Sequence, residues 1–461
     1  MSSLELARWQ FGITTLYHFI FVPLTIGLAF TVALLQLRWH RSGDERWLRA
    51  TRLWGKLMLI SFALGVATGI VQEFQFGMNW SNYSRYVGDI FGAPLAMEGL
   101  AAFFVESTFL GLWIFGWGRL SRKVHLATAW AVALSTALSA FFILAANSWM
   151  QHPVGYVMDQ GKPRLTSIGA VLFNSTAIYA FLHTLLAAAL TAGMVVIAVS
   201  AWQVRGQNDH AAGASVLRLA MPIVAVAALL QIGVGHFDGQ LMAKQQPMKM
   251  AAADAVFSSG PSKGLSLFAT GDFASNPKGL NRNIEIPKLL SFISTGYPNG
   301  TIQGINNLNA QYRKRYGPGQ YAPIVAVTYW TWRAMIACGM LMLLIGAYGW
   351  WRVRRGSLTD SPRFLRWLVP AAALPFLASL TGWTFTEMGR QPWAVFGLLK
   401  TSASNSPTVS AADVWITLVG FTLLYGVLAL FAGRLFLKTV RRGAPDAPEP
   451  VDGSPDFVLT Y

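Results

Sequence analysis

Long runs of apolar residues alternate with short polar stretches along most of the chain. About 20 apolar residues span the hydrocarbon core of a bilayer, and nine runs reach this length. They cover residues 10–37, 53–72, 93–117, 124–147, 173–201, 217–236, 324–351, 365–384 and 411–438. The pattern predicts an all-α integral membrane protein in which nine transmembrane helices form a bundle.

The composition agrees with a protein that lies in a lipid bilayer. Of the 461 residues, 54% are hydrophobic and only 12% are charged, whereas soluble proteins carry about 25% charged residues. The net charge of +16 does not indicate a nucleic-acid partner, because the basic residues lie in short connections between apolar runs. No small-residue cleavage site follows the first run, so we expect its helix to be retained.

Lysines and arginines concentrate in every second connection. The rich connections carry Arg38, Arg41, Arg46, Arg49, Arg52, Arg119, Arg122, Lys123, Arg205, Arg352, Arg354, Arg355, Arg363, Arg366, Lys438, Arg441 and Arg442. The alternate short connections carry only Arg85, Lys162, Arg164, Arg390 and Lys400. The positive-inside rule therefore places the N-terminus outside and the C-terminus in the cytoplasm, as an odd number of helices requires.

One connection, residues 237–323, is far longer than the others, and such loops are usually functional or disordered. We therefore divide the chain into helices 1–6 over 1–236, an external loop over 237–323, and helices 7–9 over 324–440. The cytoplasmic tail over 441–461 is expected to be disordered. Within the loop, residues 241–257 are expected to form a short amphipathic helix. We find no internal repeat, so an inverted-repeat transporter gains no support.

An imidazole and a thioether lie at matching depth in two predicted helices. His183 lies about ten residues past the outer start of its helix and Met335 about eleven, or roughly 15 Å deep. This pair of side chains ligates low-spin electron-transfer haem, although packing is the usual role of a membrane methionine. The single cysteine, Cys338, excludes a disulfide within the chain and a covalent Cys-x-x-Cys-His attachment, so any haem must be bound noncovalently.

Two acids lie on the third predicted helix. Glu106 is expected about 12 Å deeper than Glu98 and about 80° around the helix. Carboxylates within a membrane are unfavourable unless they are paired, protonated or coordinating. His18 lies at a depth similar to that of Glu98, so the candidate ligands gather in the outer half and Glu106 points inward. Structural packing networks and a proton or cation pathway both remain open for these acids.

Residues 382–393, Gly-Trp-Thr-Phe-Thr-Glu-Met-Gly-Arg-Gln-Pro-Trp, close the eighth apolar run. Glu387 and Arg390 stand where the helix is about to end, and Pro392 stops it by removing an N–H donor. An interfacial aromatic belt with a snorkelling arginine is the alternative to a functional polar site. The candidates to contact a haem and its propionates in this region and nearby are Trp383, Arg8, Arg333 and Arg390.

Taken together, these motifs closely resemble subunit I of cytochrome bd-type quinol oxidases over nearly the whole chain. The matching elements are Arg-Trp-Gln-Phe-Gly (8–12) with His18 downstream, Glu98 and Glu106, Asn-Ser-Trp-Met-Gln-His-Pro-Val-Gly (147–155), His183, Trp-Arg-Ala-Met (332–335) and Glu-Met-Gly-Arg-Gln-Pro-Trp (387–393). The Gly-Arg-Gln-Pro-Trp element is highly specific.

The resemblance implies a nine-helix bundle that holds three haems near its outer face. It implies His183 and Met335 as axial ligands of a low-spin haem b, and Glu387 as a ligand of a high-spin haem b. It places His18 with Glu98 at haem d, and the sequence leaves open whether a haem b stands there instead.

The resemblance also implies that the loop after helix 6 binds quinol through Lys249 and Asp254, where Asp254 departs from the more common glutamate. The loop is of the short type. The implied partners are subunit II, quinol and dioxygen in a bacterial cytoplasmic membrane, while accessory subunits and the quinone type stay open.

The implied reaction is oxidation of quinol at the loop and reduction of dioxygen to water. Because Glu106 is the acid of its helix that lies below the candidate ligands, we also expect it to carry protons from the cytoplasm. Catalytic roles are thus expected for Glu98, Glu106, Lys249 and Asp254. Two alternatives from other classes are an electron-relay cytochrome b without oxygen chemistry and a proton or cation transporter.

Overall fold

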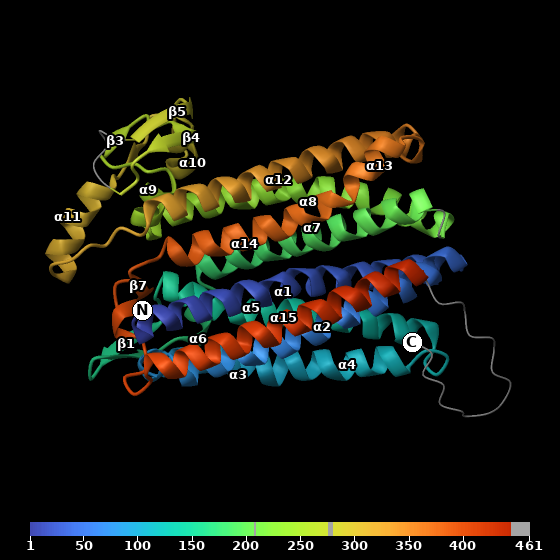
Figure 1. Ribbon diagram of the computed structural model, residues 1–461, viewed down its shortest axis with the longest axis horizontal. Helices are drawn as coiled ribbons and strands as arrows, with labels where there is room; N and C mark the ends of the chain where they lie inside the picture. The colour runs from blue at the N-terminus through green and yellow to red at the C-terminus, as the bar shows by residue number, and fades with distance from the viewer. Residues whose placement is uncertain (207–208, 275–279, 444–461) are drawn as a thin grey trace.

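The structure is a computed structural model that describes residues 1–206, 209–274 and 280–443. Nine helical spans within these ranges are long and apolar enough to cross a membrane, and they lie side by side in one bundle (Figure 1). This confirms the predicted fold class. Most of the predicted tail, residues 444–461, lies outside the described residues.

The helical spans extend beyond the apolar runs that predicted them. They are α1 (Ser3–Ser42), α2 (Glu45–Met78), α3 with η1 and α4 (Ser81–Met97, Glu98–Phe103, Phe104–Phe115), α5 (Arg122–Gln151), α7 (Ser175–Gly206), α8 (His210–Gln245), α12 (Val325–Arg354), α13 with η4 and α14 (Pro362–Leu368, Pro370–Ala372, Ala373–Met388) and α15 (Ala411–Arg442). Helix α8 therefore continues past residue 236 into the segment expected to be loop.

Local capping explains where the first two helices begin and end. The side chain of Ser2 accepts the backbone N–H of Glu5, and the Glu5 carboxylate accepts the N–H of Ser2 in return, which is a capping box. Gly43 ends α1 in the left-handed conformation with φ of 67°, which costs glycine little. Asp44 then caps α2, so two adjacent residues set the turn between the helices.

The third span is not one continuous α-helix. Between α3 and α4 the chain forms a π-helix, η1, which begins at Glu98 and ends at Phe103. Such wide turns are rare and are frequently found at functional sites. The α-helical spacing assumed for Glu98 and Glu106 from the sequence therefore does not hold.

The long connection has secondary structure of its own and lies at the same end of the bundle as the N-terminus, whereas α15 ends at the opposite end (Figure 1). The elements of this connection are α9 (Pro247–Ala253), β3 (Gly260–Pro261), β4 (Leu265–Gly271), β5 (Leu280–Ile286), α10 (Leu289–Thr295), β6 (Thr301–Ile302) and α11 (Ile305–Tyr316). Antiparallel pairing joins β4 to β5 and β3 to β6. The expected short helix corresponds to the end of α8 and to α9.

Smaller elements complete the remaining connections. They are β1 (Tyr156–Asp159), β2 (Lys162–Leu165), α6 (Ile168–Leu172), η3 (Leu358–Asp360), β7 (Trp393–Val395), β8 (Leu399–Lys400) and η5 (Thr401–Ala403). The hairpin of β1 with β2 and that of β7 with β8 are both antiparallel.

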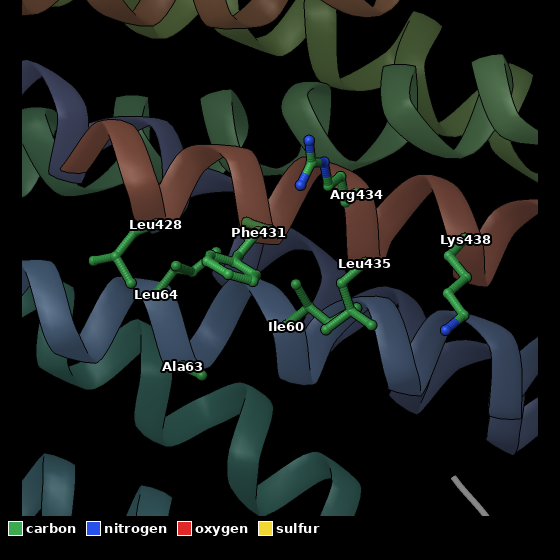
Figure 2. Close-up of a pocket in the computed structure, with 9 residues that line it drawn as sticks. Ile60, Ala63, Leu64, Leu428, Phe431, Arg434, Leu435 and Lys438 are labelled. Carbon is green, nitrogen blue, oxygen red and sulfur yellow. The ribbon is translucent and has the colours of Figure 1, made fainter. Parts of the chain in front are cut away.

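Helix α7 lies at the centre of the bundle and α15 at its edge. Of the most apolar window of each helix, 78% is buried in α7 but only 11% in α15. A cavity of about 420 Å³ opens between α15 and α2, where Leu64 and Phe431 face one another and Arg434 and Lys438 stand near one end (Figure 2). None of the candidate ligands lines this cavity, so we do not assign it to haem or quinol.

Candidate functional site

His183 and Met335 lie on helices that share two neighbours. His183 is on α7 and Met335 on α12, and α8 and α14 each pack against both of these helices. A Cβ atom on Gly235 of α8 would lie 3.8 Å from His183 Cε1, and one on Gly382 of α14 would lie 2.8 Å from Met335 Sδ. A side chain at 235 would thus only touch His183, whereas Gly382 is needed for the α14 backbone to approach Met335. Their joint role at one haem stays a prediction.

His18 is held in the tautomer that a metal ligand needs. Its Nδ1 lies 2.8 Å from Thr68 Oγ1. The Thr68 hydroxyl donates its proton to the carbonyl of Leu64 at 2.7 Å, so it can only accept from His18. Nδ1 therefore carries the proton and Nε2 keeps a free lone pair, which is the form that binds iron.

The two acids of the third span have different surroundings. Glu98 begins the π-helix and accepts a hydrogen bond of 2.5 Å from Ser139 Oγ. Glu106 lies in α4 and is only 6% exposed. Glu98 lies close enough to act electrostatically on Glu106 and also on Glu73 of α2. Glu73 was not predicted as a site residue, although it directly follows the second apolar run.

Glu387 sits in a hydrogen-bonded network at the end of α14. Its Oε1 accepts from Asn147 Nδ2 at 3.1 Å, and its Oε2 accepts from Arg390 Nη2. Arg390 is buried and also donates to the carbonyls of Trp393 and Ala394. A buried guanidinium that pairs with a carboxylate and with carbonyl groups favours a structured polar site over a snorkelling arginine.

Helix α1 packs directly on the same part of α14. Phe19, the neighbour of His18, stacks on Trp383 with ring centroids 4.9 Å apart. Trp383 lies one turn before Glu387. Arg8, also on α1, reaches Gln391 at 3.5 Å. The contacts place the predicted ligands His18 and Glu387 on two helices that face one another.

Lys249 is buried against the Gly-Arg-Gln-Pro-Trp segment. Its side chain is 4% exposed, and its Nζ donates to Gln151 Oε1 at 2.9 Å. A Cβ atom on Gly389 would lie 2.8 Å from Lys249 Cγ, so only glycine allows this approach. Burial lowers the pKa of Lys249 to about 8, against the opposing effect of Glu387. Asp238 of α8, which was not predicted, acts electrostatically on both Lys249 and His183.

Asp254 has a different partner from Lys249. It is fully buried, and its Oδ1 lies 2.5 Å from Arg333 Nη2. Arg333 also donates to the carbonyl of Ala253 at 2.7 Å, and its guanidinium lies 3.2 Å from the centre of the Tyr329 ring. The pair fixes the end of α9 to α12, two residues before Met335.

Several buried nitrogen atoms around these residues lack a hydrogen-bond partner among the described residues. They are Nε of Arg333, Nε of Arg390, Nε1 of Trp383 and Nδ1 of His183. Buried polar groups are almost always paired, so a missing partner points to a bound group. A haem would supply propionate oxygens to the arginine and tryptophan donors, so these residues fit this cofactor.

No three His, Cys, Asp or Glu side chains of the described chain converge on a metal-binding position. A haem iron does not need such a cluster, because the porphyrin supplies four nitrogen ligands and the protein only one or two. The arrangement of single ligands on separate helices is therefore compatible with haem.

Comparison with known proteins identifies the family. Residues 6–444 match the family model of cytochrome bd terminal oxidase subunit I. The chain is 42% identical to a cytochrome bd ubiquinol oxidase subunit 1 of Bacillus subtilis, covering 96% of this chain and 95% of that protein. It is 35% identical to the cytochrome bd-II ubiquinol oxidase subunit 1 of Escherichia coli, over 95% and 96% of the two chains.

A solved structure has the same fold. The bd oxidase from Geobacillus thermodenitrificans matches with a TM-score of 0.88 at 27% identity, over 96% of this chain and 99% of that chain. The sequence motifs, the nine-helix bundle and these matches agree with one another. The chain therefore belongs to the cytochrome bd terminal oxidase subunit I family.

Proposed function

We propose that this chain is the haem-carrying subunit of a quinol:oxygen oxidoreductase that reduces dioxygen to water. The observation that supports it best is the contact between the long loop and the Gly-Arg-Gln-Pro-Trp segment, where Lys249 packs on Gly389. A quinol site and a haem ligand would thereby be neighbours. When bound, the haems would carry electrons from quinol to dioxygen and supply the iron at which dioxygen is reduced.

The residues of this chain would hold three haems. His183 and Met335 are the proposed ligands of a low-spin haem b, and Glu387 of a high-spin haem b. His18, with Glu98 nearby, is proposed for haem d or a haem b in its place. The donors proposed for propionates and ring edges are Arg8, Arg333 Nε, Arg390 Nε and Trp383.

The quinol would bind at the loop end of the bundle. Lys249 can donate a hydrogen bond to a quinol oxygen, and Asp254 supplies a carboxylate that can accept a quinol proton. Because Asp254 is held by Arg333, it would also keep α9 in place during turnover.

We further propose that the loop faces the outside of a bacterial cytoplasmic membrane and that protons for water formation enter from the cytoplasm. The excess of lysine and arginine in every second connection supports this orientation. Glu106 would relay protons toward Glu98. Turnover would then build a proton gradient.

Subunit II is the proposed partner. Helix α15 exposes most of its apolar surface. Glu73, near the outer end of α2, is also exposed. A carboxylate there is unfavourable against lipid, so a protein partner with polar groups suits this face better.

The proposal is tested by purifying the protein with its partner, extracting its haems for identification, and measuring quinol-dependent oxygen uptake. We expect low-spin and high-spin haem signals together with oxygen consumption. Haem without oxygen uptake would favour an electron-relay cytochrome b, and absence of haem would favour a transporter.

Replacing Lys249 with alanine tests the quinol site. We expect the apparent KM for quinol to rise roughly tenfold or more, because a hydrogen bond from a charged donor is lost. The haems should still be reduced by an artificial electron donor. An equal loss of rate with both donors would place the defect outside this loop.

The pH dependence of quinol oxidation should report the charge of Lys249. Since burial lowers its pKa to about 8, the ammonium is present below this pH and is lost above it. Glu387 and Asp238 favour the charged form, and Arg390 opposes it. We expect the KM for quinol to rise above about pH 8 in the wild type but not in Lys249→Arg. A rise of the same size in both would exclude Lys249 as its cause.

A further inference from the structure

A continuous chain of hydrogen bonds joins the quinol loop to Glu387. Lys249 Nζ donates to Gln151 Oε1 at 2.9 Å. Gln151 Nε2 donates to Asn147 Oδ1 at 2.8 Å, and Asn147 Nδ2 donates to Glu387 Oε1 at 3.1 Å. Two uncharged amides on α5 thus bridge an ammonium group and a carboxylate that lie on other segments.

The two ends of this chain fix the orientation of both amides. An ammonium group can only donate hydrogen bonds, and an ionised carboxylate can only accept them. Gln151 must therefore present its oxygen to Lys249, and Asn147 must present its nitrogen to Glu387. All three bonds point the same way, so each polarises the next and strengthens it.

The spacing along α5 makes the bridge possible. Asn147 and Gln151 are four residues apart, so they lie on the same face of the helix. Gln151 is buried, so water would not readily replace the hydrogen bonds of its side chain.

We propose that Gln151 and Asn147 are positioning residues that make the hydrogen bonding of Glu387 depend on Lys249, and so couple the quinol loop to the haem that Glu387 holds. This inference rests on the proposed function of the site. When Lys249 turns to a quinol oxygen, Gln151 loses its charged donor and the bond from Asn147 to Glu387 weakens.

The bridge is not what holds the loop in place. Gln246 Nε2 donates to the backbone carbonyl of Gln151 at 2.8 Å, and this contact does not require a glutamine at 151. Lys249 also keeps its packing on Gly389, and Asp254 keeps its ion pair with Arg333. Removing the Gln151 amide should therefore change the electrostatics of Glu387 more than the fold.

Two variants separate the two ends of the bridge. Gln151→Leu removes the side-chain hydrogen bonds to Lys249 and Asn147, together with a longer one from Gln246 Nε2 at 3.5 Å. Gln151→Glu keeps an acceptor for Lys249 but cannot donate to Asn147. As a matched control, Gln245→Leu removes a glutamine that binds Ser175 and Thr176 at the end of α8, outside the bridge. Each variant is made in the full complex with its partner subunit.

The measurements are the midpoint potential of the high-spin haem assigned to Glu387, and the KM and kcat with ubiquinol-1. A weaker hydrogen bond from Asn147 leaves more charge on the Glu387 carboxylate, which stabilises ferric iron. We expect the potential to fall in both Gln151 variants and to stay unchanged in Gln245→Leu. The KM should fall in Gln151→Leu, because Lys249 no longer breaks a hydrogen bond to reach the quinol oxygen. It should rise in Gln151→Glu, because a carboxylate holds the ammonium group more tightly than an amide does.

An unchanged low-spin haem signal reports that a variant has assembled. If Gln151→Leu does not assemble, the measurements on Gln151→Glu decide the test. Potentials in the assembled Gln151 variants equal to those of Gln245→Leu would overturn the inference. A wild-type complex that lacks haem or quinol oxidation would instead overturn the proposed function, so the two failures are distinguishable.

Discussion

Replacing Met335 with leucine should remove the low-spin haem signal and lower quinol oxidation by at least roughly tenfold, while the helix bundle stays folded. Leucine nearly conserves the volume of methionine but has no sulfur to bind iron. The Met335 sulfur also faces Gly382 at a distance that leaves no room for a side chain there. The site therefore depends on the shape of this residue as well as on its chemistry.

Met342→Leu is the matched control for this experiment. Met342 lies two turns further along α12 and is buried in the apolar core, so the same substitution there changes packing alone. Absorption spectra of the reduced proteins and quinol oxidation rates are compared. If Met335→Leu matches Met342→Leu in both, Met335 is not a haem ligand.

The sequence predicted the spans of this protein well because membrane helices are defined by length and apolarity alone. All nine predicted runs correspond to helical spans of the described chain. The depth argument predicted only that His183 and Met335 lie at equal depth. That their helices share neighbours is seen in the structure, because periodicity cannot say which helices pack together. The family resemblance, not the pattern, supplied the roles of Lys249 and Asp254.

The polar contacts around Glu387 could not be predicted in the same way. Asn147 and Gln151 lie within the Asn-Ser-Trp-Met-Gln-His-Pro-Val-Gly motif and are four residues apart, a spacing that puts them on one face of a helix. Their partners, however, come from α9 and α14, which are distant in sequence. Asp238 was missed because it lies beyond the apolar part of α8. The ion pair of Asp254 with Arg333 was not predicted either, and the role of Asp254 at the quinol stays a prediction.

The π-helix is the other feature that apolar periodicity could not predict, and it changes the geometry of Glu98 and Glu106. An i→i+5 turn contains more residues than an α turn, so it rotates less per residue. Because η1 covers Glu98–Phe103, the rotation between the two acids is smaller than the roughly 80° of an α-helix. Glu106 therefore lies more nearly beneath Glu98, which favours transfer of a proton between them.

Replacing Glu106 with glutamine should slow oxygen reduction by roughly 10²-fold, a size typical of losing a proton-transfer group. Glutamine keeps the shape and hydrogen bonding of the residue but cannot release a proton. The low-spin haem should remain bound, because its proposed ligands His183 and Met335 lie on other helices. Glu98→Gln should differ, since Glu98 lies among the proposed ligands and its loss should also disturb the high-spin haem spectra.

Proteoliposomes that contain the purified complex allow turnover and membrane potential to be measured together. If Glu106 relays protons from the cytoplasm, Glu106→Gln should lose both, because protons for water formation no longer cross the membrane. The buried position of Glu106, only 6% exposed, makes direct supply from bulk water slow. Wild-type turnover together with wild-type potential in this variant would exclude the relay, and Glu106 would then be a structural acid of the helix bundle.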